Sequence, residues 1–215
     1  MNSEKDPFDN LVAQLYNIAN TQSQPKIDHL AVFYRKIYSN RHKVDTLKNF
    51  IEVLCPKENI EYNYKGLYIA LKSQKGWGDK TAALFTKSIF HIHSNDYPLH
   101  LKIWADVPKM LKTNDEFYLP VDAVIIAIFK YIQSDVNWDF RKVNKELKMH
   151  YEGNDIEIWD DLWFWGFITQ NGTRDNRKME WNLNKYWSMT ESDKDPNMIA
   201  EIESKAGVFL EILNK

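Results

Sequence analysis

The residues with the clearest chemical potential lie around two glycines, Gly76 and Gly78, which stand between two amphipathic stretches and precede Lys80. Two glycines separated by one residue allow a sharp turn and expose backbone amides, because glycine has no Cβ. The first N–H groups of the helix that follows have no intrahelical acceptor, so they make a ready site for a phosphate. A lysine beside such a turn is a candidate nucleophile in its neutral form. An ordinary helix–loop–helix turn is the alternative for the two glycines alone.

Positive charge is concentrated around the same stretch. Between Lys65 and Lys87 there are five lysines and one acidic residue, Asp79, whereas the 215-residue chain has a formal net charge of −2. The low overall charge argues against unspecific coating of nucleic acid, since that affinity comes largely from neutralising phosphates. Lys75 and Lys87 are the candidate phosphate contacts beside Lys80, and a solvated helical face is the alternative.

A carboxylate stands at the start of a strongly apolar stretch further along the chain. Pro120 precedes Val121 and Asp122, and an apolar helix is expected over 123–132. An aspartate at this position can accept hydrogen bonds from the amides of the first turn, which holds it rigidly. Such a group can deprotonate an attacking nucleophile or stabilise a developing cation.

Both stretches resemble one enzyme family. Residues 76–82, Gly-Trp-Gly-Asp-Lys-Thr-Ala, resemble the Gly-Val-Gly-x-Lys-Thr-Ala hairpin of the helix-hairpin-helix DNA glycosylases, and 119–122 resemble the Pro-Val-Asp element of the 8-oxoguanine glycosylase branch. The resemblance covers 65–131. It implies that Lys80 is a Schiff-base nucleophile and Asp122 the catalytic carboxylate. It also implies that the hairpin binds DNA through Gly76, Gly78, Lys75, Thr81 and Lys87.

The resemblance implies a base-excision repair enzyme that flips a damaged base out of double-stranded DNA. The expected activity is that of a glycosylase with associated AP (β-elimination) lyase activity on oxidised guanine, in a monomer that uses no metal or cofactor. Aromatic residues of the C-terminal half, Trp163, Trp165 and Phe167, are the candidate base pocket. Core packing is the alternative for these aromatics. For the whole chain, the alternatives are a monofunctional glycosylase for another damaged base and a non-catalytic helix-hairpin-helix DNA-binding module.

Three features depart from the family pattern. Gln74 and Lys75 stand where Leu-Pro is usual, Trp77 replaces a smaller apolar residue, and the 42 positions from Lys80 to Asp122 are about twice the usual interval. The extra residues, roughly 90–118, are expected to loop outward as short helices so that the lysine and the aspartate can meet.

A histidine cluster offers a different chemistry. His91, His93, Asp96 and His100 supply nitrogen and oxygen ligands of the kind that hold zinc, which would fit a helical metal-dependent hydrolase. The alternative is a polar helix end and loop, because histidines two positions apart point to different faces of a helix.

Apolar residues recur at helical spacing, which predicts an all-α fold of two helical lobes with a helix-hairpin-helix motif and a cleft between them. One lobe is expected over 24–120, with the hairpin at about 65–93, and the other over 1–23 plus 121–215. The expected helices cover 8–18, 30–37, 47–54 (with Asp45 as N-cap), 65–74, 79–93, 123–132, 139–150, 156–170 and 196–213, whereas 174–188 is expected to form a loop or short hairpin.

Composition narrows the class of protein. The single cysteine, Cys55, excludes an internal disulfide framework and a four-cysteine iron–sulfur or zinc site. The polar, acidic start of the chain and the lack of an apolar run of ~18 residues predict neither secretion nor membrane insertion. An intracellular protein is expected, either cytoplasmic and nucleoid-associated or nuclear.

Overall fold

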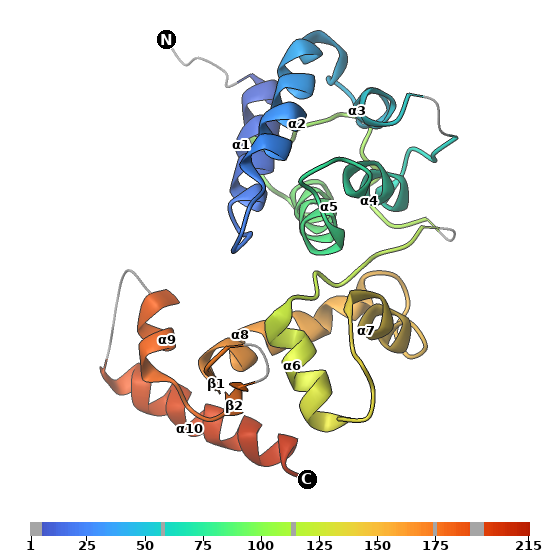
Figure 1. The fold of residues 1–215 in the computed structure, drawn as a ribbon. Helices are drawn as coiled ribbons and strands as arrows, with labels where there is room; N and C mark the ends of the chain where they lie inside the picture. Colours follow the sequence, from blue (N-terminus) through green and yellow to red (C-terminus); the bar gives the residue numbers. More distant parts are fainter. Residues whose placement is uncertain (1–5, 57–58, 113–114, 174–175, 190–195) are drawn as a thin grey trace. The chain divides into compact units, whose positions relative to one another are not determined.

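The computed structural model describes residues 6–56, 59–112, 115–173, 176–189 and 196–215. Within them the chain is mostly helical, with one two-stranded sheet (Figure 1). The chain divides into two compact units, Met1–Pro120 with Glu152–Asn154 and Val121–Tyr151 with Asp155–Lys215. The prediction of an all-α protein is confirmed.

The first unit is built from five α-helices and two 3-10 turns in its described residues. They are α1 (Pro7–Ala19), α2 (Ile27–Ser39), η1 (Arg41–Lys43), α3 (Leu47–Leu54), α4 (Tyr64–Lys72), α5 (Asp79–Ser94) and η2 (Leu99–Leu101).

Short polar side chains begin several of these helices. Asp6 accepts from the Phe8 amide at the start of α1 (2.9 Å), and Asn63 accepts from the Gly66 amide at the start of α4 (2.8 Å). The N-cap of α3 is Thr46, which accepts from the Asn49 amide (3.0 Å), and not Asp45 as expected. These contacts satisfy amides that have no intrahelical acceptor, so the starts of the helices are fixed locally.

Helix α5 packs against both α4 and α1. Its side chains Phe85 and Ile89 are fully buried, as are Leu11 and Leu15 of α1. Helix α1 therefore belongs to the first unit and not to the second lobe, where residues 1–23 are expected from the sequence. The reason is the apolar stripe of α1, which is buried with α5.

The described part of 95–118 does not form short helices that loop outward. Apart from η2 this segment is irregular, and Ile103, Trp104 and Phe117 are buried in the first unit. The indole of Trp104 lies 4.9 Å from the ring of Phe50, between centroids, and donates to the Val44 carbonyl oxygen at 2.9 Å. The expectation of outward helices is wrong because these large apolar side chains are packed into the core.

The described residues of the second unit form five further helices, a 3-10 segment that begins in the first unit, and two short strands. They are α6 (Ala123–Ile132), α7 (Phe140–Leu147), η3 (Gly153–Asp160), α8 (Asp161–Ile168), β1 (Gln170–Asn171), β2 (Lys178–Met179), α9 (Leu183–Met189) and α10 (Pro196–Leu213). The tryptophan-rich stretch expected as one helix over 156–170 is thus part 3-10 and part α-helical.

Helices α6 and α8 approach closely at Gly166. A Cβ at this position would lie 2.6 Å from Ile128 Cδ1 and 2.8 Å from Val124 Cγ1, so a larger residue would force the two helices apart. The strands β1 and β2 pair antiparallel, with Gln170 opposite Met179. The stretch 174–188 therefore contains the second strand of a short hairpin, β2, and most of α9. Residues 174–175 lie outside the described residues.

Candidate functional site

Gly76 makes the turn between α4 and α5. The Gln74 amide donates to the Leu71 carbonyl oxygen (2.9 Å), the Trp77 amide donates to the Gln74 carbonyl oxygen (3.1 Å), and Gly76 has a φ of +89°. A Cβ there would lie 3.2 Å from the backbone nitrogen of Leu30 and 3.1 Å from its Cδ2. Both the backbone angle and the crowding therefore require glycine.

Gly78 meets a different demand. It is the exposed N-cap of α5 with an extended backbone, φ −123° and ψ −179°, and a Cβ on it would have no heavy atom within 4 Å. The space beside this backbone is open. Its own N–H already donates to Thr81 Oγ1 (3.0 Å), so it is not the exposed amide that the sequence analysis expected.

Thr81 caps the helix from within. Its side chain is buried, and its hydroxyl accepts from the Gly78 amide. A capping box has two reciprocal hydrogen bonds, and this is the one that can form when the N-cap residue is a glycine. The structure therefore gives Thr81 a capping contact in place of the direct DNA contact that was expected.

Trp77 anchors the turn in the core. Its ring is 6% exposed and lies 5.2 Å from Phe33 and 6.1 Å from Phe85, between centroids. The Gln22 side chain also donates to the Gly76 carbonyl oxygen (3.2 Å). This aromatic packing explains why a tryptophan stands where a smaller residue is usual, and it holds the turn that contains Gly76 and the exposed Gly78.

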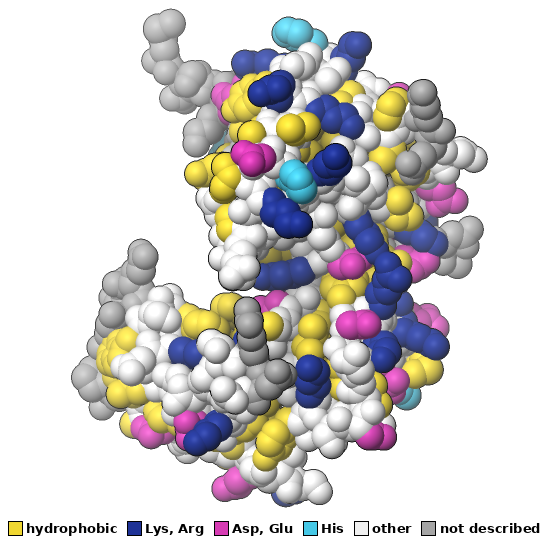
Figure 2. All heavy atoms as spheres, in the orientation of Figure 1, with side chains coloured by type: hydrophobic (Ala, Val, Ile, Leu, Met, Phe, Trp, Pro, Cys, Tyr) yellow, Lys and Arg dark blue, Asp and Glu magenta, His cyan; other side chains and the backbone are white. Residues whose placement is uncertain are grey.

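The lysines of the basic window differ in their surroundings. Lys75 is exposed, while Lys80, in the first turn of α5, and Lys87 are half-buried. Lys65 and Lys72 form ion pairs with Glu116 and Asp79. On the face drawn in Figure 2, Lys and Arg side chains are interspersed with acidic and uncharged groups. The local positive charge is therefore smaller than the count of lysines suggests.

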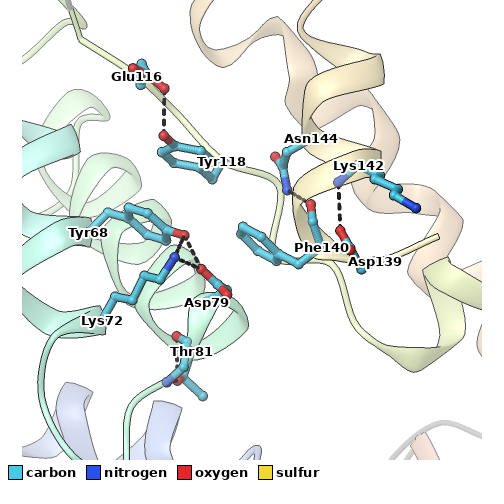
Figure 3. Close-up of polar contacts among 11 residues, drawn as sticks. Tyr68, Lys72, Asp79, Thr81, Glu116, Tyr118, Asp139, Phe140, Lys142 and Asn144 are labelled. Atoms are coloured by element: carbon cyan, nitrogen blue, oxygen red, sulfur yellow. Dashed lines mark hydrogen bonds and ion pairs between the residues drawn. The ribbon is translucent and has the colours of Figure 1, made fainter. Parts of the chain in front are cut away.

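A polar and aromatic cluster that the sequence pattern does not predict lies beside the start of α5 (Figure 3). Tyr68 donates from its hydroxyl to Asp79 Oδ1 (2.6 Å), which also pairs with Lys72. The Tyr68 ring stacks on Tyr118 at 4.3 Å and 22°. Tyr118 in turn donates to Glu116 Oε2 (2.6 Å), and burial followed by this carboxylate raises the pKa of the Tyr118 phenol. These contacts connect the segment 115–118 to α4 and to Asp79, the residue before Lys80.

Asp122 is the N-cap of α6, as expected. Its Oδ1 accepts from the amides of Val124 (2.8 Å) and Ile125 (3.2 Å), and its Oδ2 accepts from the indole Nε1 of Trp163 (2.9 Å). Donors on both oxygens fix the orientation of the carboxylate within the second unit.

Two of the three candidate base-pocket residues lie together. Trp163 stacks on Phe167 at 5.2 Å and 13°, and Lys185 Nζ lies 5.2 Å from the centre of the Phe167 ring. Burial, with a smaller contribution from Arg177, lowers the pKa of Lys185. Sequence spacing gave no signal for Lys185. Asp122, Trp163, Phe167 and Lys185 therefore form one continuous group of contacts.

Trp165 takes a separate place. It points to α10, where its ring lies 6.4 Å from that of Phe209, and both line a small hollow with Tyr151 and Leu162. Trp163 and Trp165 are two positions apart on a helix, so they face different sides. Trp165 is thus not part of the group around Asp122.

The histidine cluster does not converge on one point. His93 is buried and accepts from the Ile103 amide through Nε2 (3.3 Å), whereas His100 is exposed. Among the side chains that the structure describes, no three His, Cys, Asp or Glu groups are arranged to hold a metal ion. Among all the helices that the structure describes, none is both long enough and apolar enough to span a bilayer.

Comparisons with protein-family models, with curated proteins and with solved structures gave no significant match.

Proposed function

We propose that this chain is a DNA base-excision glycosylase with associated AP lyase activity, which removes oxidised guanine from double-stranded DNA as a monomer. The observation that carries the proposal is the turn between α4 and α5. Gly76 is required by its φ of +89°, Gly78 borders open space, and Lys80 lies in the first turn of the following helix. This is the arrangement expected of a helix-hairpin-helix motif with a nucleophilic lysine.

The proposed hairpin binds a phosphate with backbone groups. The open side of Gly78 admits a strand closely, and the start of α5 carries the positive end of the helix dipole. Trp77 holds the turn rigidly from inside the core. A small number of charges then suffices, which agrees with a formal net charge of −2.

The proposed reaction starts with attack of the Lys80 amine on C1′ of the damaged nucleotide. The bond from C1′ to the base breaks, and the base leaves with the bonding electrons and gains a proton. Ring opening and loss of a proton from nitrogen give an imine, after which removal of a C2′ proton expels the 3′ phosphate and nicks the strand. Asp122 accepts the proton of the attacking amine and stabilises the positive charge on the sugar.

The proposed base pocket is the outer face of Trp163, whose inner face stacks on Phe167. Trp163 is 39% exposed and its indole N–H holds Asp122, so the same residue would touch the base and orient the carboxylate. An exposed aromatic face stacks on any unpaired base, with a contribution of about 1–3 kcal/mol per base.

The test begins with duplexes that carry 8-oxoguanine, uracil, thymine glycol or an alkylated purine. Strand cleavage at 8-oxoguanine and a covalent adduct after borohydride reduction are expected for the wild type. Lys80→Gln should lose both the adduct and the nick while still binding the duplex. The matched control is Lys43→Gln, which makes the same change at an exposed lysine of η1, outside the hairpin, and should keep both activities.

Asp122→Asn should bind DNA almost normally and cleave it about 10²-fold more slowly. Asparagine is also a good N-cap, so α6 should be preserved. Asp139→Asn makes the same change at the N-cap of α7 and should leave cleavage unaffected. Excision without a trapped adduct would show a monofunctional enzyme in which water is the nucleophile.

One observation favours a second candidate, a non-catalytic DNA-binding module. Asp122 already accepts three hydrogen bonds within its own unit, which is a complete structural role. Such a module would bind duplexes through the hairpin and lose that affinity in Gly78→Val, yet would cleave none of the four lesions.

A further inference from the structure

A cavity of about 810 Å³ lies in the first unit at the far end of α5 from the hairpin. It is lined by the start of α1, by η1, by His93 of the last turn of α5 and by 99–109. His93 is 14 positions after Asp79, which corresponds to about 21 Å along the helix. This volume is typical of pockets for small molecules, and the place is separate from the proposed DNA-binding hairpin.

His93 supplies an oriented donor to this cavity. Its side chain is 5% exposed and lines the cavity, and its Nε2 accepts from the Ile103 amide (3.3 Å). Burial, and then nearby Lys102, lower the pKa of His93 to about 4, so the ring is neutral at neutral pH. A neutral imidazole that accepts at Nε2 carries its proton on Nδ1. No other described residue hydrogen-bonds this ring, so Nδ1–H is available to a bound molecule.

Two lysines, Lys102 and Lys109, line the same cavity and form no ion pair with any other described residue. Arg41 and Asp6 on the wall form an ion pair (2.5 Å), and the Asp45 carboxylate accepts from the Asn49 side-chain amide (2.9 Å) but keeps its negative charge. The two lysines thus leave the lining with a local excess of one positive charge.

Another part of the wall is apolar. Phe8, Val107 and Ile103 are buried residues that line the same cavity. A ligand that fits would therefore combine a compact anionic group with an apolar or planar body. A phosphate monoester carries a charge of about −1.5 to −2 at pH 7 and three acceptor oxygens, which matches two ammonium groups and one N–H donor.

We propose that this cavity binds a small organic phosphate, whose phosphate group is held by His93 Nδ1–H, Lys102 and Lys109 and whose body lies on Phe8 and Val107. The site is independent of the proposed glycosylase activity. It would be occupied whether or not the hairpin binds DNA.

The test is calorimetric titration of the full chain with two probes, phenyl phosphate and deoxyguanosine 5′-monophosphate. At least one should bind saturably, while phenol, deoxyguanosine and inorganic phosphate should each bind at least about tenfold more weakly, because each lacks one half of the ligand. Lys102→Gln should weaken binding of the better probe about tenfold, the scale of one lost hydrogen bond to a charged group. Lys43→Gln, an exposed lysine on η1 outside the cavity, should change nothing.

A second measurement reports directly on His93. Long-range proton–nitrogen spectra should show Nδ1 protonated in the unliganded chain, and the probe should shift this resonance. His93→Gln removes a buried ring from the core, whereas the Lys102 side chain is only half-buried, so Lys102→Gln is the deciding variant. Failure of both probes to bind, equal binding of deoxyguanosine, or unchanged affinity in Lys102→Gln would each overturn the proposal.

Discussion

At the scale of single residues, Gly76 and Gly78 show how two identical side chains meet different demands. Gly76 has a φ of +89° and is crowded by His29 and Leu30, whereas Gly78 is extended and borders open space. Gly76 is therefore required by the fold, whereas the lack of a side chain at Gly78 leaves room for a ligand at the surface. A motif of two glycines does not distinguish these roles, because the neighbours of Gly76 come from α2.

The two glycines should separate stability from binding. Gly76→Ala should lower the free energy of unfolding by about 1–3 kcal/mol, since alanine is strained at this φ. Gly78→Val should change stability by less than about 1 kcal/mol, yet weaken duplex binding strongly, because its side chain fills the space that a strand would occupy. Urea unfolding and fluorescence anisotropy measure the two effects. Unchanged duplex affinity in Gly78→Val would remove the hairpin from the binding site.

His93 should make stability depend on pH. Its pKa is lowered from 6.5 to about 4, so between these values the unfolded chain holds a proton that the folded chain does not. The free energy of unfolding should therefore fall as the pH falls from about 6.5 to about 4, by about 3 kcal/mol at most. Above about pH 6.5, His93 does not contribute to the change of the free energy of unfolding with pH. Urea midpoints at several pH values should show this component in the wild type and in His42→Gln, but not in His93→Gln; equal slopes in all three would refute it.

At the scale of elements, the regular helices could be predicted because each buries one stripe with a 3.6-residue period. The starts of α5 and α6 followed from local signals, a glycine pair and an aspartate N-cap. The described part of 95–118 could not be predicted, because its buried residues Trp104 and Phe117 have no period. The cluster of Tyr68, Asp79 and Tyr118 was missed for the same reason, since only tertiary packing brings its members together.

Asp115 should matter more to stability than its position in an irregular segment suggests. It accepts from the amides of Tyr64 (3.2 Å) and Lys65 (2.7 Å), so it caps α4 from 50 or more positions away. Asp115→Ala should cost about 1–3 kcal/mol, because both amides lose an acceptor at a half-buried site, while Asp115→Asn should cost less. The neighbouring Glu116→Gln removes the charge that pairs with Lys65 at a partly exposed site, while the new amide oxygen can still accept from Tyr118, so it should cost under about 1 kcal/mol. Equal losses for Asp115→Ala and Glu116→Gln would show that the segment is held by packing alone.

At the scale of the whole molecule, charge sets the manner in which DNA can be bound. The chain has a formal net charge of −2, and two of the five lysines of the 65–87 window are held in ion pairs. A second basic group, Arg141, Lys142 and Lys145, lies exposed on α7 in the other unit. The number of phosphates neutralised therefore distinguishes binding by the hairpin alone from binding by both basic groups.

The dependence of duplex affinity on salt counts these phosphates. Each phosphate neutralised on B-DNA contributes about −0.9 to the slope of log K against log of salt concentration, so contacts from Lys75 and Lys87 predict a slope of about −1.8. If the basic face of α7 also binds, three more contacts would bring the slope to about −4.5. We expect the smaller value, because the hairpin binds largely through backbone groups. Lys75→Gln should reduce the magnitude of the slope by about 0.9, and Lys43→Gln, outside the hairpin, should leave it unchanged. A slope near −4.5 that Lys142→Gln makes shallower would show that α7 also contacts the duplex, and that the hairpin is not the main source of affinity.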